Sequence, residues 1–364
     1  MSTTGNPTVE QKPKQTSKPT IRPSDVAADR DAVMTLFGRN LPESTTERYD
    51  WLYVGGKTRN WVACDEDRQL VGSIGLMPRT MNLFGEEHPC GQPVDLNVDR
   101  RYRLGWLALQ LQRTIATEVN EGRLSLAYGL PNAQSEAVAR RAGYDVVGPV
   151  TRWAKPLKTH DYLCERLPDR VPTSAASKAL DAALWLRSPE SRYRRRRNYR
   201  VEVTDTFDER FDLLWHGAAQ QFSIIGRRTA DYLNWRFCDA PNTVFRTLCL
   251  SDRRNDRLLA YLVYTVRDEV AYVADFLHAD DSLGDAVMAE FVKMMRVQGA
   301  KAIITIFTGA GSVARRLKRF GFSRRPSSWK IMIHSDAVRL GIPGYKLRDV
   351  NNWFLTRADV DTEF

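Results

Sequence analysis

The sequence predicts a mixed α/β protein made of two similar domains, and three observations support this fold class. With 364 residues, the chain is longer than a single hydrophobic core usually supports. Its 43% hydrophobic and 27% charged residues are typical of a folded globular chain rather than a disordered one. An internal repeat then divides the chain into two halves with the same order of elements.

The repeat consists of three segments that recur in the same order. RYDWLY around Trp51 resembles DYLNWRF around Trp235, and Asp95 in PVDLNV corresponds to Asp275 in YVADFL. SEAVARRAGY and SVARRLKRFGF each end in a glycine followed by an aromatic residue. The paired positions lie 184, 180 and 178 residues apart, which indicates two copies of one fold.

Each copy is expected to contain a helix, a β-hairpin, a third strand, a helix, a strand, another helix and a final strand. In the first copy these cover residues 29–37, 61–64 with 69–76, a strand ending near 98, 106–119, 124–130 and a helix ending at 143. In the second they cover 207–221, 244–250 with 258–266, a strand ending near 277, 302–307 and a helix ending at 321. Leu107, Leu111 and Ile115 recur every four residues, which predicts one apolar helical face. Gly143 and Gly321 suit left-handed helix ends.

These elements predict domains at residues 21–158 and 200–335, joined by a basic linker with a helix at 159–199. Residues 336–364 form a C-terminal extension. Residues 1–20 are rich in Ser, Thr, Pro, Gln and Lys and contain no apolar signal core, so we interpret them as a disordered tail. No run approaches the roughly 18 consecutive apolar residues of a membrane span. A cytoplasmic protein is therefore expected, with peripheral contact at the inner membrane left open.

Cysteine and histidine usage does not indicate a metal or disulfide site. The cysteines are odd in number and widely spaced: Cys64, Cys90, Cys164, Cys238 and Cys249. The histidines are isolated from one another: His88, His160, His216, His278 and His334. We therefore expect reduced thiols and no metal cofactor.

The formal net charge of +10 favours an anionic partner, such as a nucleotide-bearing cofactor, nucleic acid, anionic lipid or acidic glycan. The densest cluster, Arg192–Arg200, reads RYRRRRNYR. It is interpreted either as a solvated linker or as a contact for RNA or an anionic surface.

The order of elements resembles that of the GNAT N-acyltransferase superfamily in both halves. In that family the loop after a splayed strand holds the coenzyme A pyrophosphate at a helix N-terminus, with the pattern Q/R-x-x-G-x-G/A. Arg103 and Ala108 match the ends of this pattern, and Trp106 occupies its central glycine position. The resemblance implies an acyl-CoA co-substrate bound by Leu96, Val98, Arg103, Leu104, Gly105, Trp106, Leu107 and Ala108.

The second copy has the acidic sequence HADDSLGD where the phosphates would bind. Carboxylates facing phosphates are electrostatically unfavourable. We therefore expect the first copy to bind acyl-CoA, and the second to be degenerate.

Catalytic roles follow from the same resemblance. Asp95, beside the splayed strand, is the candidate general base, although it could instead hold a loop or bind the substrate ammonium. Asn132 follows the next strand, where it could contact the cofactor or acceptor, or cap a helix. Ala139 and Leu317 stand where the family often has a tyrosine acid, so another tyrosine or water is expected to protonate the thiolate.

Candidate acceptor contacts are aromatic. Tyr49, Trp51 and Trp235 could stack on a sugar ring, or they could be core anchors. The C-terminal sequence from Trp353 to Asp361 has the spacing W-x-x-T-x-x-D-x-D, which resembles the ending of tandem GNAT proteins from bacterial polysaccharide and cell-envelope gene clusters. This resemblance implies an amino-sugar, envelope or natural-product amine as acceptor.

The leading hypothesis is thus an acyl-CoA-dependent N-acyltransferase. Two alternatives remain. One is a Fem-like transferase that uses aminoacyl-tRNA, with the arginine run contacting RNA. The other is a non-catalytic GNAT-fold binding protein.

Overall fold

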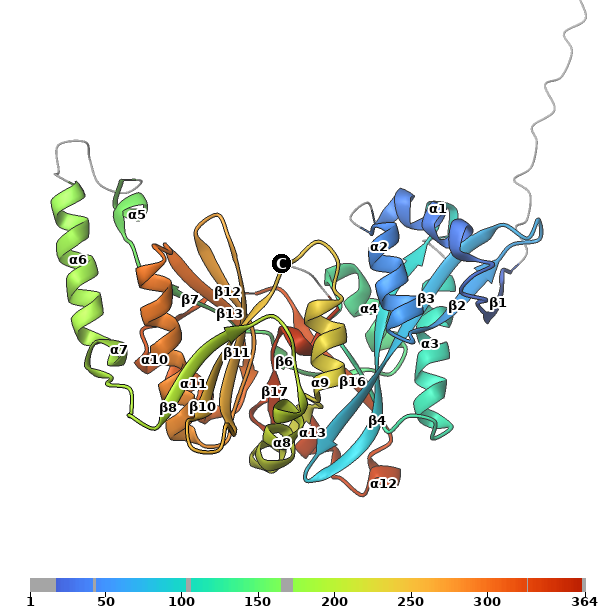
Figure 1. Cartoon of the computed structure of the whole chain (residues 1–364). Helices are drawn as coiled ribbons and strands as arrows, with labels where there is room; N and C mark the ends of the chain where they lie inside the picture. The colour runs from blue at the N-terminus through green and yellow to red at the C-terminus, as the bar shows by residue number, and fades with distance from the viewer. Residues whose placement is uncertain (1–17, 42–43, 103–105, 165–172, 326, 362–364) are drawn as a thin grey trace, which may run out of the picture.

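The structure, a computed structural model, describes residues 18–41, 44–102, 106–164, 173–325 and 327–361. They form two lobes side by side, each with its own twisted sheet, and the last described residues lie between the lobes (Figure 1). Most of the expected N-terminal tail lies outside these residues, and Thr20 already begins the first strand.

The N-terminal sheet has the order β14-β17-β9-β3-β4-β5-β16-β6, with β1 and β2 pairing beside the first part of β3. Its strands are β1 (Thr20–Pro23), β2 (Arg59–Cys64), β3 (Leu70–Leu83), β4 (Glu86–Val98), β5 (Leu126–Gly129), β6 (Asp145–Pro149), β9 (Ile224–Gly226), β14 (Thr308–Gly309), β16 (Lys330–Ser335) and β17 (Trp353–Leu355). It is mixed, because β4 and β5 run parallel while β3 and β4 run antiparallel.

The C-terminal sheet has the order β15-β7-β13-β12-β11-β10-β8. Its strands are β7 (Arg152–Pro156), β8 (Tyr199–Thr204), β10 (Arg246–Asp252), β11 (Leu258–Arg267), β12 (Val270–His278), β13 (Ala302–Ile306) and β15 (Ser323–Arg325). Here β12 and β13 form the parallel pair. The mixed α/β class with two GNAT-like sheets is therefore confirmed.

The two halves of the chain exchange strands: β7 joins the C-terminal sheet, and β9, β14, β16 and β17 join the N-terminal sheet. β7, which the sequence assigns to the first copy, pairs with β13 and β15 of the C-terminal sheet. β16, assigned to the second copy, pairs with β5 and β6 of the N-terminal sheet. The physical reason is packing: Trp153 of β7 is buried in the C-terminal core, and Met332 of β16 is buried in the N-terminal core. Each sheet is thus completed by the other half of the chain.

The helices cover the sheets and fill the junction between the lobes. They are α1 (Arg30–Asn40), α2 (Thr46–Tyr49), α3 (Leu107–Asn120), α4 (Ala133–Arg141), α5 (His160–Cys164), α6 (Thr173–Arg187), α7 (Pro189–Arg192), α8 (Glu209–Ala218), α9 (Ala230–Leu233), α10 (Asp281–Val297), α11 (Gly311–Arg319), α12 (Ala337–Leu340) and α13 (Gly344–Arg348). A π-helical turn follows both α2 and α9, at Asp50–Gly55 and Asn234–Cys238.

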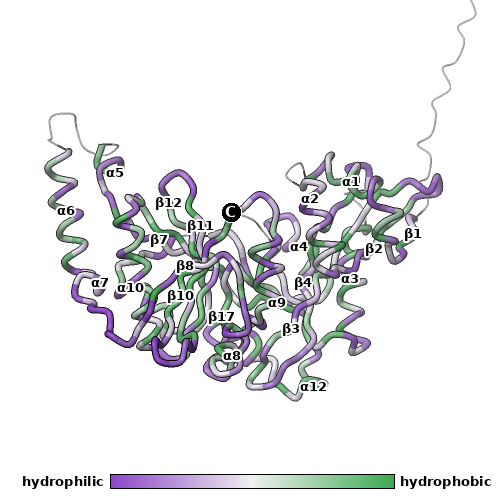
Figure 2. Tube along the Cα trace, in the orientation of Figure 1, coloured by the Kyte–Doolittle hydropathy of each residue, from purple (hydrophilic) through white to green (hydrophobic). Residues whose placement is uncertain are grey.

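Hydrophobic residues concentrate in the strands, whereas the connection from α7 to β8 is hydrophilic (Figure 2). Helices α3, α8 and α10 contribute buried apolar side chains to the two cores. Helix α6 stands at the outer edge of the C-terminal lobe (Figure 1). None of the helices in the described part of the chain combines the length and apolar character needed to cross a bilayer.

Candidate functional site

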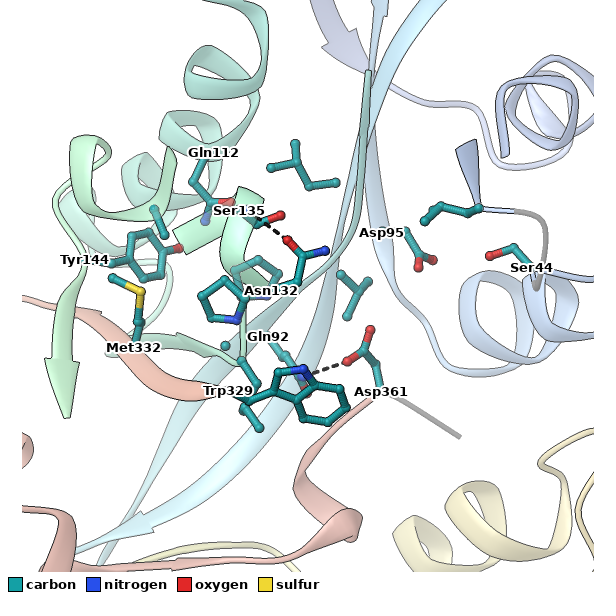
Figure 3. Close-up of a pocket in the computed structure, with 18 of the residues that line it drawn as sticks. Ser44, Gln92, Asp95, Gln112, Asn132, Ser135, Tyr144, Trp329, Met332 and Asp361 are labelled. Carbon is teal, nitrogen blue, oxygen red and sulfur yellow. Dashed lines mark hydrogen bonds between the residues drawn. The ribbon is translucent and has the colours of Figure 1, made fainter. Parts of the chain in front are cut away.

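Strands β4 and β5 separate to form a V-shaped opening. They pair at Cys90 with Leu126 and at Gly91 with Ala127 before they diverge. A cavity of about 650 Å³ lies at this opening (Figure 3). Its polar lining comes from the α1–α2 region, β4, α3, α4 and its flanking turns, and the C-terminal segment: Asn40, Ser44, Arg48, Gln92, Asp95, Gln112, Asn132, Ser135, Tyr144 and Asp361.

Asp95 reaches the cavity from a β-bulge. Ser73 pairs with Asn97 and Gly75 with Val94, so β4 has one more residue than β3 between these pairs. Asp95 has a φ of 51°, in the left-handed region that residues other than glycine rarely adopt. The bulge directs its carboxylate toward the cavity (Figure 3).

Two donors hold the Asp95 carboxylate. Arg48 Nη1 and the Tyr53 hydroxyl both donate to Asp95 Oδ2, at 3.0 and 2.9 Å. A side chain at Gly75 would lie 2.7 Å from the Tyr53 oxygen, so glycine makes room for this contact. Burial, and then the Asp95 charge, raise the pKa of Tyr53 well above its usual value. Tyr53 therefore stays protonated and fixes the orientation of Asp95.

Asp361 brings a second carboxylate to the same cavity. Gln92 Nε2 donates to Asp361 Oδ1 at 3.1 Å, and Arg48 Nη2 lies 3.8 Å from Asp361 Oδ2. Burial raises the pKa of Asp361, Asp95 adds to this effect, and Arg48 opposes it. One guanidinium group is thus shared by two carboxylates, of which Asp361 has a raised affinity for a proton.

Asn132 caps helix α4 and lines the cavity at the same time. Its Oδ1 accepts hydrogen bonds from the backbone amides of Gln134 and Ser135, at 3.1 and 2.9 Å. Its amide nitrogen points toward the open space (Figure 3). The two roles weighed for this residue are therefore compatible, because the oxygen caps while the nitrogen remains on the cavity side.

A tyrosine lines the cavity and is a candidate for the general acid that the family resemblance did not assign. Ala139 of α4 lines the cavity with a small side chain, and Tyr144, just after the helix, lines it beside Gln112. Burial raises the pKa of Tyr144. Its hydroxyl is therefore protonated at neutral pH, and can act as a hydrogen-bond donor.

The predicted donor-binding residues fall into three groups. Leu96 lines the cavity, whereas Val98 and Leu107 are buried in the N-terminal core beside the half-buried Ala108. Trp106 is the first residue before α3 and lies 5.9 Å below the Lys18 ammonium. Arg103, Leu104 and Gly105 lie outside the described residues.

The predicted aromatic acceptor contacts pack elsewhere. Trp51 and Trp235 stack with ring centroids 5.0 Å apart, and each indole donates to the backbone carbonyl of the other. Tyr49 is buried, stacks on Tyr53 at 4.6 Å and donates to the carbonyl of Val26. These contacts match the alternative role of core anchors, and none of the three residues is in the cavity lining given by the described residues.

The C-terminal lobe has a similar polar cluster, but it is sealed. Arg228 Nε donates to Asp275 Oδ2 at 3.0 Å, and the Tyr261 hydroxyl donates to the same oxygen at 2.8 Å. Arg228 also contacts Asp359, and Thr356 donates to Asp275. Asp275 and Arg228 are fully buried. Burial raises the pKa of Asp275. For Asp359, Arg228, Arg79 and a backbone hydrogen bond from Thr356 together outweigh the effect of burial, so its pKa is lowered.

Phenylalanines occupy the space beside the parallel pair of that lobe. Phe354 of β17 packs against Phe276 of β12 and Phe307 after β13, with ring centroids 5.4 and 5.2 Å away. Phe276 and Phe307 also contact each other at 5.8 Å. The C-terminal segment therefore fills the region that corresponds to the N-terminal opening.

The start of α10 is likewise satisfied by protein groups. Asp280 accepts hydrogen bonds from the amides of Ser282 and Leu283. Arg316 of α11 pairs with Asp281 and Asp285, 2.7 and 2.9 Å away. The amides and charges that would bind a phosphate at a helix N-terminus are thus already used within the chain.

Sequence reasoning missed Arg48, Tyr53, Gln92, Tyr144 and Asp361 as parts of the site. The signal for Asp361 was present, because it closes the W-x-x-T-x-x-D-x-D motif, but the motif was used only to suggest a subgroup. No signal in the sequence places Arg48 beside Asp95, since the contact joins residues far apart in the chain. Within the described residues, no three metal-binding side chains come together in a way that could hold an ion.

Comparisons with known proteins agree with this geometry. Residues 20–147 match the family described as acetyltransferase (GNAT) domain. A search of curated protein sequences finds no match to the chain. Residues 20–147 of the N-terminal lobe therefore correspond to a GNAT acetyltransferase domain, which supports an acyltransferase.

Solved structures share the fold over most of the chain. A probable N-acyltransferase from Enterococcus faecalis aligns with a TM-score of 0.60 and 14% identity, over 87% of this chain and 72% of that one. A GCN5-related N-acetyltransferase from Anabaena variabilis gives 0.62 and 12%, over 86% and 72%. N-myristoyltransferase from Saccharomyces cerevisiae, solved with bound myristoyl-CoA, gives 0.52 and 12%, over 90% and 81%.

Proposed function

We propose that this chain, with its GNAT acetyltransferase domain at residues 20–147, transfers an acetyl or longer acyl group from acyl-CoA to an amine. The observation that carries the proposal is the open V between β4 and β5, with Asp95, Asn132 and Asp361 facing one cavity. The pantetheine arm would lie between the two strands, and the diphosphate would lie near the N-terminus of α3. The sealed C-terminal lobe supports assigning the donor to the N-terminal lobe alone.

The two carboxylates would divide the work of preparing the amine. An ammonium group must lose its proton before its nitrogen can attack the thioester carbon. Asp361 is the better base because its pKa is raised, whereas Asp95 accepts two hydrogen bonds on one oxygen. Asp361 would accept the proton directly or through water, while Asp95 orients the ammonium.

Asn132 and Tyr144 would serve the thioester. As the C–N bond forms, negative charge develops on the carbonyl oxygen, and the Asn132 amide nitrogen is placed to donate to a donor carbonyl. The C–S bond then breaks, and the Tyr144 hydroxyl would donate to the departing sulfur. These roles use groups that line a single cavity.

Binding of the acyl-CoA donor between β4 and β5 is tested by placing a larger side chain in the opening between these strands. A methyl group at Gly129 would lie 3.7 Å from Pro93 of β4, an ordinary contact, so alanine is tolerated there. A phenylalanine would place a ring between the strands, as in the C-terminal lobe. By calorimetry we expect acetyl-CoA and a longer acyl-CoA to bind the wild type and Gly129→Ala, and to lose binding in Gly129→Phe. Equal binding by Gly129→Phe, or none by the wild type, would contradict the proposal.

An amino-sugar or cell-envelope amine is proposed as the acceptor, on the strength of the C-terminal motif. Its last residue, Asp361, lines the cavity, whereas Thr356 and Asp359 join the buried cluster of the other lobe. The motif therefore links the two lobes and supplies one group to the site. A screen that measures release of the coenzyme A thiol, beginning with amino sugars, tests this acceptor class.

A peripheral contact with an anionic membrane is proposed for α6 and the basic run after it. Leu180, Trp185 and Leu186 are 39, 41 and 59% exposed on α6. Exposed arginines follow within Arg192–Arg200. Exposed apolar and cationic side chains together favour a lipid surface over RNA. Sedimentation with anionic but not with neutral vesicles would support this contact, and salt-sensitive tRNA binding without vesicle binding would favour the Fem-like alternative.

A further inference from the structure

A second cavity, of about 590 Å³, opens on the C-terminal sheet. Its lining includes Arg152 of β7, Tyr272 of β12 and the end of β13. Arg267, the 327–329 segment before β16, and Arg357 of the C-terminal segment complete the lining. Each of the three arginines thus comes from a different part of the chain.

The charge on this lining is strongly positive. Arg152, Arg267 and Arg357 face one acidic side chain, Asp268, within the lining. Burial, and then the nearby guanidinium groups of Arg236, Arg152 and Arg267, lower the pKa of Arg357 to about 10. Positive charges that disfavour one another in a partly buried space are stabilised by a bound anion.

The two cavities meet at one side chain, because Trp329 lines both. The C-terminal segment also runs from one to the other, with Arg357 in the second cavity and Asp361 in the first. Four residues of chain span at most about 14 Å, which limits the distance between these two backbone positions. A molecule that occupies both cavities would therefore have to extend past Trp329.

Their charges are opposite. The first cavity has two carboxylates and one guanidinium group, from Asp95, Asp361 and Arg48. The second has three guanidinium groups and one carboxylate. The donor's diphosphate does not account for the second cavity, since α3 belongs to the N-terminal lobe and the arginines surround strands of the C-terminal sheet.

We infer that the acceptor amine carries an oxyanion group, a carboxylate or a phosphate, which binds to Arg152, Arg267 and Arg357 while its ammonium group faces Asp361 and Asp95. The inference rests on the proposed N-acyltransferase function and narrows its substrate class. Neutral amines lack the second point of attachment.

The anion site is tested first without any acceptor. Inorganic phosphate and malonate serve as probes, and calorimetry is performed on protein saturated with coenzyme A, so that the donor site is occupied. We expect at least one probe to bind the wild type. The dissociation constant of that probe should rise at least about tenfold in Arg152→Gln. Arg187→Gln, which removes an exposed arginine on α6, is the matched control and should bind as the wild type does. The stronger probe identifies the preferred oxyanion, and absence of binding, or an unchanged constant in Arg152→Gln, would overturn the inference.

Pairs of anionic and neutral acceptor amines then test this inference separately from the proposed acyltransferase function. Glucosamine 6-phosphate is compared with glucosamine, and an amino acid with its amide, by release of the coenzyme A thiol. We expect kcat/KM to be at least about tenfold higher for the anionic member of a pair, and its KM to rise in Arg152→Gln. Equal turnover of neutral and anionic members would sink the inference and leave the acyltransferase intact. Failure of the wild type to bind acyl-CoA would instead remove the proposed function.

Discussion

The two lobes contain similar polar clusters in opposite settings. In the N-terminal lobe, Arg48 and Tyr53 hold Asp95 at the edge of an open cavity. In the C-terminal lobe, Arg228 and Tyr261 hold Asp275 where it is fully buried. The same kind of cluster therefore places one aspartate, Asp95, at a cavity, and buries the other, Asp275, inside the protein. The two clusters differ in whether neighbouring segments of the chain fill the space beside them.

The C-terminal segment makes this difference. Phe354 fills the space in the C-terminal lobe, and Asp359 completes its ionic cluster. Two residues later, Asp361 enters the N-terminal cavity as an additional polar group. One short segment thus fills space in the C-terminal lobe and contributes a carboxylate to the cavity of the N-terminal lobe.

The largest expected effect comes from removing the buried arginine. Arg228→Met leaves Asp275 and Asp359 without their main cation, so unfolding free energy should fall by about 3–5 kcal/mol. Arg48→Met, beside the cavity, should cost less stability and reduce kcat more strongly. Denaturant titration and thiol-release kinetics on both variants measure this. Equal stability losses would show that the clusters do not differ as described.

Opening the sealed lobe is expected to cost nearly as much. Phe354→Ala removes a ring packed against Phe276 and Phe307, and comparable core truncations cost about 3–5 kcal/mol. Phe354→Leu should cost less because it leaves a smaller cavity. Neither variant should gain a second acyl-CoA site, because Asp280 still caps α10. Binding of two acyl-CoA molecules per chain in Phe354→Ala, measured by calorimetry, would contradict this difference between the lobes.

The C-terminal lobe should also confer an acid sensitivity. Burial, and then Arg316, lower the pKa of His278 to about 4, whereas an unfolded histidine titrates near 6.5. Its neutral form is favoured in the folded state, so this stability is present above pH 6.5 and is lost as the pH falls toward 4. Between pH 7 and pH 5 the loss is roughly 2 kcal/mol. Denaturant titrations of wild type and His278→Asn at both pH values measure the difference, and an equal pH dependence would contradict it.

The smallest effect distinguishes two helix caps. Asp280→Ala and Asn132→Ala each remove a side chain that caps a helix, and each should cost about 1 kcal/mol. Asn132→Ala should in addition lower kcat, because its amide nitrogen faces the cavity. Asn132→Asp keeps the cap but not the donor. A wild-type rate in Asn132→Asp would restrict this residue to capping.

Much of the fold could be predicted because it is encoded locally. The apolar spacing of Leu107, Leu111 and Ile115 gave a helix within one residue of α3, Leu107–Asn120. The hairpin around residues 65–67 followed from apolar runs on both sides of turn residues. The predicted strand end near 277 and the predicted strand at 302–307 lie within one residue of the end of β12 and of the bounds of β13. Such patterns depend on neighbours in sequence, which a single chain displays fully.

The strand exchange and much of the site depend on contacts between distant residues. Nothing near Trp153 tells that its ring packs in the C-terminal core, and nothing near Asp361 tells which lobe it enters. Asp95 was found because a family resemblance pointed to it. Trp51 and Trp235 carried a strong repeat signal, but the same signal fits a packing role and a binding role.

The exchange of β7 and β16 affects the order in which the two sheets can fold. β16 pairs with β5 across roughly 200 residues of chain, so a large loop must close before the N-terminal sheet is complete. During synthesis, the first lobe must wait with an unpaired strand edge until residue 335 has left the ribosome. A cut in the linker would therefore leave each half without strands that the other half supplies to its sheet.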